Sequence, residues 1–146
     1  MASANNFFTE EEKEVIVGAI RKTELHTTGE IRVHITNNSN KDVFKDALRI
    51  FEKLNMHKTP FRNGVLIFIA VKDRKFSVIG DEGIYDKLDK DYWNFISSIL
   101  ARNFSEKKHV NGLIEAIENI GNTLAKHYPN LDDIQTNNLP DDLSFE

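Results

Sequence analysis

The spacing of apolar residues along the first third of the chain predicts a helix, a strand and a second helix. Thr9 and Glu12 have the spacing of a capping box ahead of an apolar helix face, so we expect a helix over residues 9–26. Residues 30–36 alternate apolar and polar side chains, the period of a strand that is covered on one face only. Helical spacing then predicts a second helix over about residues 41–55.

The next segment is the most apolar part of the chain. Residues 65–71 hold no polar side chain, which is typical of a strand buried on both faces in a parallel pair. A charged turn at residues 72–74 leads into a further strand at 75–79, so these two strands should form a hairpin. Because a helix connects the strand at 30–36 to the strand at 65–71, we expect those two to be parallel, with a right-handed crossover.

Two long amphipathic helices are predicted after the hairpin. Apolar residues at helical spacing run from Leu88 to Leu100 and again from Val110 to Leu124, and Pro129 ends the second run. The predicted order is α-β-α-β-β-α-α. It indicates an α/β fold whose small mixed sheet combines one parallel crossover with one hairpin.

The chain of 146 residues has the length of one domain, which we assign to residues 1–129. Residues 130–146 hold five acidic side chains and no Lys or Arg. Few apolar residues are available there to offset the entropy of ordering, so we expect a disordered acidic tail. If the tail is functional, it either binds a partner or docks back on its own domain.

Composition and charge exclude several classes of protein. There is no cysteine, which excludes thiol nucleophiles, disulfides and cysteine-bound zinc. The longest apolar run, residues 64–71, is too short to span a membrane, and the first residues lack the pattern of a secretory signal. The net charge of −4 comes mostly from the tail and leaves no basic stripe. We therefore expect a cytoplasmic protein that neither inserts into a membrane nor binds nucleic acid.

Several short motifs, in their order and spacing, resemble the TPM domain family, which takes its name from a thylakoid-lumen protein, a photosystem II protein and a worm receptor modulator. They are Thr28-Gly29-Glu30-Ile31, Arg62-Asn63-Gly64-Val65-Leu66, Asp73-Arg74-Lys75, Gly80-Asp81-Glu82-Gly83-Ile84, Gly112-Leu113 and Gly121-Asn122-Thr123-Leu124. The resemblance covers about residues 8–129. The tail is similar to that of a short bacterial branch without a signal peptide or membrane anchor.

This resemblance carries expectations about fold and function. It implies a three-layer α/β/α sandwich, divalent-metal binding in some members, and a weak acid phosphatase activity in the plant branch. For bacterial members it also implies genes that lie beside those of LemA-type membrane proteins, so a LemA-type protein is the expected partner. The sequence does not indicate an oligomeric state.

The loop from Gly80 to Gly83 is the sharpest local feature, because two glycines flank two acids between a strand and a helix. Such a loop can approach a ligand closely and offers the oxygen donors that Mg²⁺ and Ca²⁺ prefer. The predicted topology brings this loop to the same edge of the sheet as Glu30 and Asn63. The candidate metal ligands are Glu30, Asp81, Glu82 and Asp86, with Asn63, Gly80 and Gly83 as supporting loop residues.

Two other interpretations remain open. In the first, the same residues are structural: Asn63 and Gly64 supply turn geometry, Asp81 caps a helix, and Glu30 is a solvated acid at the strand edge. In the second, the site lies at the opposite edge, where ligands of parallel sheets usually bind. There Asn38, Asp73 and Arg74 would hold a small anion or a metal, unless they form only a charged hairpin turn.

Two functions follow from these patterns. The first is a cytoplasmic accessory module that binds Mg²⁺ or Ca²⁺ and a protein partner, in membrane-protein maintenance or stress response. The alternative is a weak metal-dependent acid phosphatase that hydrolyses phosphomonoesters with a metal-bound water, with His34 or Asp86 as proton donor. The sequence contains no Walker loop, no His-Glu-x-x-His and no Gly-x-Ser-x-Gly motif, which favours the accessory module.

Overall fold

The computed structural model describes residues 3–39, 42–131 and 143–145. Where η denotes a short 3-10 helix, the elements in chain order are η1 (Ala4–Asn6), α1 (Glu10–Glu24), β1 (Glu30–Thr36), α2 (Val43–Lys53), η2 (Met56–Lys58), β2 (Gly64–Ala70), β3 (Lys75–Gly80), α3 (Glu82–Tyr85), α4 (Lys90–Ser105), α5 (His109–His127) and β4 (Ser144–Phe145). The α/β fold is therefore confirmed.

The strands form a four-stranded sheet in the order β3-β2-β1-β4. β1 and β2 are parallel, with Glu30 opposite Gly64, and β2 and β3 are antiparallel, with Val65 opposite Gly80. The parallel connection and the hairpin are thus confirmed. The sequence did not predict β4, which pairs parallel to β1 at the edge of the sheet.

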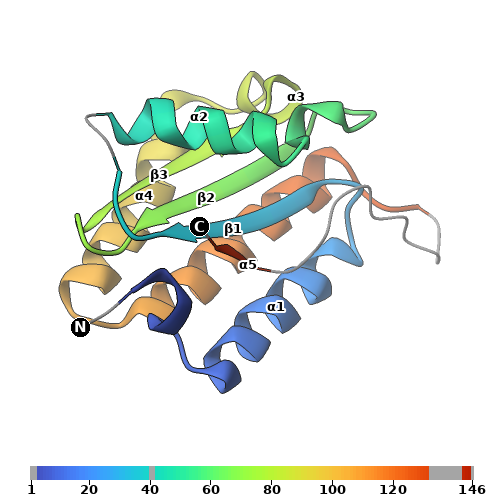
Figure 1. The fold of residues 1–146 in the computed structure, drawn as a ribbon. Coiled ribbons are helices and arrows are strands. Elements are labelled where there is room, and N and C mark those ends of the chain that lie inside the picture. Colours follow the sequence, from blue (N-terminus) through green and yellow to red (C-terminus); the bar gives the residue numbers. More distant parts are fainter. Residues whose placement is uncertain (1–2, 40–41, 132–142, 146) are drawn as a thin grey trace.

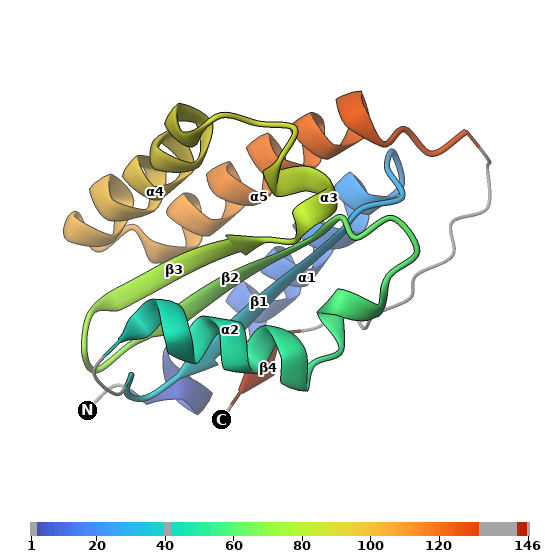
Figure 2. The same cartoon turned by 90° about the horizontal axis from the view of Figure 1, so that it is seen from above.

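Helices cover both faces of the sheet, so the molecule has three layers (Figure 1). α2 crosses one face, and α1, α4 and α5 cover the other, as the view from above α2 also shows (Figure 2). The larger apolar core lies between the sheet and these three helices, and includes Val33 and Ile67. A smaller core beneath α2 joins Ile50 to Leu66 and Phe68.

β1 differs from its prediction, because all seven of its residues are buried rather than every second one. Its polar side chains face the same side of the sheet as Leu66 and Phe68, to which they are paired in register. The His34 ring stacks on the Phe68 ring with centroids 5.8 Å apart, and His34 Nδ1 lies 2.7 Å from the Ser144 hydroxyl oxygen of β4. The alternation along β1 therefore distinguishes an apolar face from a polar face, and both faces are buried.

The helix boundaries follow local side-chain chemistry. The capping box ahead of α1 is present: the Glu12 amide donates to Thr9 Oγ1 at 3.1 Å, and the Thr9 amide donates to Glu12 Oε1 at 2.8 Å. The helix that Asp81 caps is α3, a separate element of four residues that the sequence did not distinguish from the long helix after it. A helix of one turn is too short to show an apolar period.

Part of the expected disordered tail has a defined place. Leu143 and Phe145 pack against the larger core, and the Lys13 ammonium lies 4.8 Å from the centroid of the Phe145 ring. The described end of the chain thus docks back on its own domain, which corrects the expectation of disorder for residues 143–145. The rest of the expected tail, residues 132–142 and 146, lies outside the described residues.

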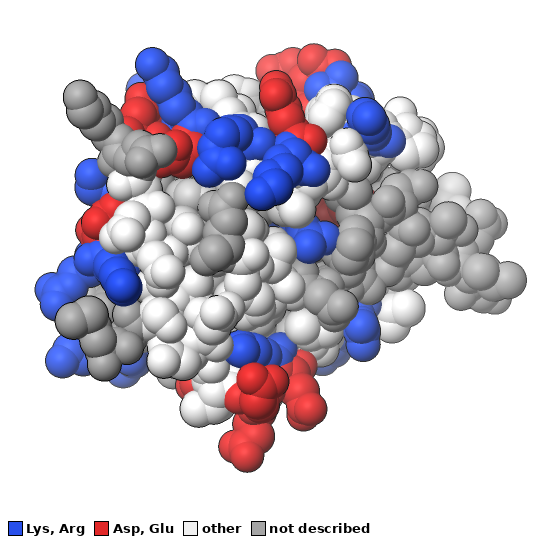
Figure 3. All heavy atoms as spheres, in the orientation of Figure 1, with Lys and Arg blue, Asp and Glu red and all other residues white. Residues whose placement is uncertain are grey.

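The surface charge is mixed on the face seen in Figure 3. Basic and acidic side chains alternate over α2 in the upper part of the view, and acidic side chains gather in the lower part, at the start of α1. Among the helices of the described ranges, none has both the length and the apolar character needed to cross a membrane.

Candidate functional site

The amino end of the parallel strands gathers the residues of the first candidate site. The Asp81 amide donates to the Gly64 carbonyl at 2.9 Å, and Gly64 in turn lies opposite Glu30. Glu30 and Asp81 therefore lie at the same end of the sheet, on either side of β2. The usual strand spacing separates their backbones by about 10 Å.

Arg62 is the principal partner of Asp81. Its Nε donates to Asp81 Oδ2 at 2.7 Å and its Nη2 to Oδ1 at 2.8 Å, the bidentate geometry that makes an arginine–carboxylate pair strong. Asp81 is only 6% exposed and also caps α3, because its Oδ1 accepts the Glu82 amide at 2.8 Å. The hydrogen bonds to Asp81 raise the pKa of the Arg62 guanidinium above its ordinary value. Asp81 is thus a helix cap, as one interpretation of the sequence proposed.

A backbone hydrogen bond also joins the two loops that carry Arg62 and Asp81. The Gly83 amide donates to the Arg62 carbonyl at 2.7 Å, and Arg62 itself has a left-handed conformation with φ of 52°. A side chain on Gly83 would overlap the Phe61 carbonyl oxygen and lie 2.5 Å from that of Arg62. Arg62 therefore supplies the unusual turn geometry that the sequence assigned to Asn63 and Gly64.

The other supporting residues serve packing. Asn63 is buried, and its Nδ2 donates to the Thr28 hydroxyl at 3.2 Å. Gly80 lies beneath Trp93, whose Cη2 would be 2.5 Å from an added Cβ. Gly80 has no room for a side chain because the Trp93 ring fills that space. Gly83 has none because the backbone of residues 61 and 62 lies there.

The donor set at this edge does not fit a resident divalent cation, which needs several free oxygen ligands. Arg62 engages both Asp81 oxygens, and its Nη1 also lies 3.2 Å from Glu82 Oε1. Glu30 was expected to be solvated but is only 2% exposed, so that expectation is wrong. β2 also separates Glu30 from Asp81. Asp86 is exposed at the end of α3. Within the described residues, no three His, Asp or Glu side chains are grouped to hold a metal.

His34 lies too far along β1 to serve this edge. It is four residues from Glu30, which corresponds to roughly 13 Å at the usual rise of a strand. Its ring contacts Phe68 and the Ser144 hydroxyl near the other end of the sheet. His34 is therefore not placed to transfer a proton at Asp81.

Two exposed aromatic side chains lie next to the Arg62–Asp81 pair in the chain: Phe61 directly precedes Arg62, and Tyr85 is the last residue of α3, which Asp81 caps. Phe61 is 54% exposed and Tyr85 is 50% exposed. A second ring supports each of them: Tyr128 lies 6.0 Å from Phe61 and Trp93 stacks 5.6 Å from Tyr85, measured between centroids. The Tyr128 hydroxyl donates to the Gly83 carbonyl at 2.6 Å and so fixes its ring beside α3. We call the exposed rings of Phe61 and Tyr85, together with Tyr128 and the buried Trp93 that support them, the aromatic surface.

Sequence reasoning missed the aromatic surface as a site. Phe61 stands in a connection without periodicity, and Trp93 belongs to the apolar face of a helix. The one local signal is that Phe61 directly precedes Arg62 in the motif that resembles the family.

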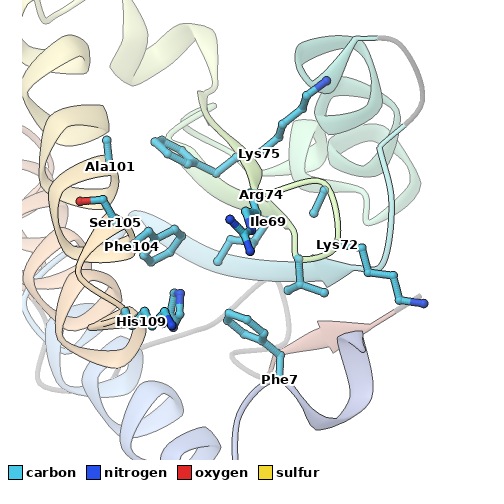
Figure 4. Close-up of a pocket in the computed structure, with 13 residues that line it drawn as sticks. Phe7, Ile69, Lys72, Arg74, Lys75, Ala101, Phe104, Ser105 and His109 are labelled. Carbon is cyan, nitrogen blue, oxygen red and sulfur yellow. The ribbon is translucent and has the colours of Figure 1, made fainter. Parts of the chain in front are cut away.

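At the opposite end of the sheet, the three candidate residues do not form one site. Asn38 is exposed, whereas Asp73 Oδ2 accepts the Ser39 amide at 2.7 Å and so belongs to the turn. Ser39 also donates from its hydroxyl to Asp46 Oδ2 at 2.7 Å. Arg74 is exposed and lines a pocket of about 730 Å³ (Figure 4).

A family model described as "TPM domain" matches residues 2–123, most of the chain. The chain belongs to the TPM domain family. None of the curated proteins matches this TPM domain.

Among solved structures, the TPM domain is similar to the BA42 protein from the psychrophilic bacterium Bizionia argentinensis. The two share 41% sequence identity, the match covers 96% of each chain, and the TM-score is 0.88. This likeness extends over the whole three-layer arrangement.

Two more distant structures share the fold alone. The N-terminal domain of the cg2496 protein from Corynebacterium glutamicum is 11% identical, with a TM-score of 0.64 over 80% of this chain and 74% of the other. The N-terminal domain of a protein from P. gingivalis is 16% identical, with a TM-score of 0.65 over 83% and 78% of the two chains.

Proposed function

We propose that this TPM domain is a cytoplasmic accessory module without catalytic activity, and that it binds a protein partner through the aromatic surface. The observation that carries this proposal is the half-exposure of Phe61 and Tyr85, each held by a second ring. Large aromatic side chains beside an arginine are the residue types that contribute most to binding energy at protein interfaces. Rings that are already fixed lose little conformational entropy when a partner binds.

The proposed partner is a LemA-type membrane protein, and the role is in membrane-protein maintenance or stress response. The surface suits a partner that presents apolar side chains with charged residues around them. Arg62, Glu82 and Lys87 border the rings, and the Lys87 ammonium lies 5.0 Å from the centroid of the Tyr128 ring. Such a charged border would contribute to orientation and association rate more than to affinity.

The geometry favours binding over phosphate hydrolysis. Asp81 already accepts three hydrogen bonds, two from the Arg62 guanidinium and one from the Glu82 amide, and the positive charge of Arg62 opposes a cation or a nucleophilic role there. A cation at Asp81 would have to displace the guanidinium. Glu82 and Asp86 are exposed acids on one short helix, and two such groups support only weak, largely hydrated cation binding.

The proposal is tested by calorimetric titration of the purified domain with the water-soluble part of a LemA-type protein from the same organism. Replacement of either exposed ring, in separate Phe61→Ser and Tyr85→Ser variants, should weaken binding about tenfold or more. The matched control is Phe44→Ser, because Phe44 is 52% exposed on α2, away from the aromatic surface.

Two binding results would overturn the proposed interaction. One is that the soluble part of the LemA-type protein does not bind. The other is that Phe44→Ser weakens binding as much as Phe61→Ser. A parallel assay of phosphomonoester hydrolysis should show no turnover above a metal-only control, and turnover lost in Asp81→Ala would favour the phosphatase instead.

A further inference from the structure

The pocket lined by Arg74 lies at the other end of the sheet from Asp81, where β2 ends and the hairpin turns. It has a volume of about 730 Å³, within the usual range for small-molecule sites. Its walls come from the end of β2, the hairpin, the end of α4, the α4–α5 connection and the segment before α1. The carboxyl ends of strands are where open α/β sheets usually bind ligands.

The inner wall of this pocket is aromatic. Phe76 contacts Phe104 with centroids 5.8 Å apart, Phe104 contacts His109 at 5.1 Å, and His109 contacts Phe7 at 4.7 Å. In Figure 4, the rings of Phe104, His109 and Phe7 lie next to one another at the recess. These rings offer an apolar surface to the body of a ligand.

The rim of the pocket is basic. Lys72, Arg74, Lys75 and Lys107 line it, and none of its lining residues is acidic. In the described parts of the chain, none of these four side chains forms an ion pair or a hydrogen bond. The two acids next to these cations in sequence are not part of the lining: Asp73 accepts the Ser39 amide, and Glu106 lies 3.6 Å from the Lys108 ammonium. The positive charge of the rim is therefore available to an anion.

The backbone places two of these cations at an energetic cost. Among the described residues, four residues other than glycine have positive φ, and two of them, Arg74 (φ 55°) and Lys107 (φ 61°), line this pocket. Asn or Gly would adopt the left-handed conformation more readily. Lys107 has this conformation at the end of α4, where the Lys108 amide donates to the Asn103 carbonyl at 2.8 Å, and Arg74 has it in the hairpin turn, so both side chains start from fixed backbone positions.

We propose that this pocket binds a small amphipathic anion, with an aliphatic or aromatic body against the rings and a terminal carboxylate or phosphate at Arg74 and Lys107. The ligand class follows from charge complementarity at the rim and from the apolar inner wall. Figure 4 shows the Arg74 guanidinium between the two sides of the recess, whereas Lys72 extends away from it. This site is independent of the proposed partner surface, which lies at the opposite end of the sheet.

Decanoate, used below its micelle concentration, is the probe for an amide NMR titration of the whole chain. We expect saturable shifts at residues 69–76 and 101–109. Decan-1-ol matches the apolar body without the charge, and inorganic phosphate supplies an anion without the body, so both should bind at least tenfold more weakly.

The double variant Arg74→Asn with Lys107→Asn removes the charges while keeping residues that accept a left-handed backbone. It should weaken decanoate binding at least tenfold and leave decan-1-ol unchanged. Lys126→Gln, at the far end of α5, should bind decanoate as the unaltered chain does. Ala101→Trp, on the exposed side of α4, should block the recess for both amphiphiles.

Four results would overturn the proposal. The first is no saturable decanoate binding below millimolar concentration. The second is equal binding of decanoate and decan-1-ol with no effect of the double variant, which would mean a plain apolar recess. The third is phosphate binding as tight as decanoate binding, which would mean an anion site only. The last is saturable shifts confined to residues outside the pocket.

Discussion

Arg62 and Asp81 form a two-point contact, through Nε at 2.7 Å and Nη2 at 2.8 Å, that joins the segment before β2 to the start of α3. The same contact neutralises the most buried acid of the Gly80–Gly83 loop. The loop that looked like a cation site in the sequence is therefore held by a cation of the chain itself, and the exposed Phe61 and Tyr85 lie next to this pair in the chain.

Removal of the carboxylate should destabilise the fold locally. Asp81→Ala loses the cap of α3 and the Arg62 contact, so we expect the free energy of unfolding to fall by about 1–2 kcal/mol. Chemical denaturation measures the change. In a double-mutant cycle with Arg62→Asn, which tolerates a left-handed backbone, the two effects should be less than additive. Strict additivity would mean that the pair contributes nothing in solution.

Gly83 and Gly18 make a matched pair of substitutions. Gly83→Ala places a Cβ against two backbone carbonyl oxygens, which cannot move as a side chain could, so a loss of about 1–3 kcal/mol is expected. Gly18→Ala, on the exposed side of α1, meets nothing within 4 Å and should gain about 0.5–1 kcal/mol from helix propensity. Thermal melting distinguishes them, and a stable Gly83→Ala would show that the loops separate in solution.

Stability should depend on pH through His109. Burial lowers the pKa of His109 below its ordinary value of 6.5, Lys107 lowers it further, and Glu12 opposes the shift. The unfolded chain then binds more protons as the pH falls below 6.5, so this contribution is present above that value and is lost toward the folded pKa. Denaturation between pH 7.5 and 5 should show a flatter dependence for His109→Gln. An unchanged slope would assign the dependence to other groups.

The end of the chain should protect the edge of the sheet. β4 pairs with β1 at residues 34 and 35, so removal of residues 143–146 should expose backbone groups there. Amide hydrogen exchange at residues 34–36 should become about five- to tenfold faster, as the loss of a hydrogen bond of about 1 kcal/mol implies. Exchange in β2 is the internal control. Equal acceleration in β2 would mean global destabilisation instead.

The local patterns predicted the parts of the fold that local chemistry determines. The strand Glu30–Thr36 was predicted residue for residue, because an alternation with period two depends only on neighbouring positions. The cap at Thr9 and the charged turn at residues 72–74 are equally local. α3 was not distinguished from the long helix after it because one turn of helix carries no period.

The remaining features depend on contacts between distant parts of the chain. The polar side of β1 is buried partly by Ser144, which lies 110 positions after His34. Arg62 is 19 residues from Asp81 and belongs to a different motif, so the sequence gives no sign that the two side chains pair. The basic pocket draws on Phe7, Arg74 and His109, three positions without a common pattern.

The account rests on Arg62, rather than a divalent cation, as the partner of Asp81. The most direct test is an amide NMR titration with Mg²⁺ and then Ca²⁺, which follows residues 80–83 in the unaltered chain and in Arg62→Asn. We expect no saturable shifts below millimolar concentration in the unaltered chain, and tighter binding once the guanidinium is removed. Saturable submillimolar binding at Asp81 with Arg62 present, unchanged in Arg62→Asn, would contradict it.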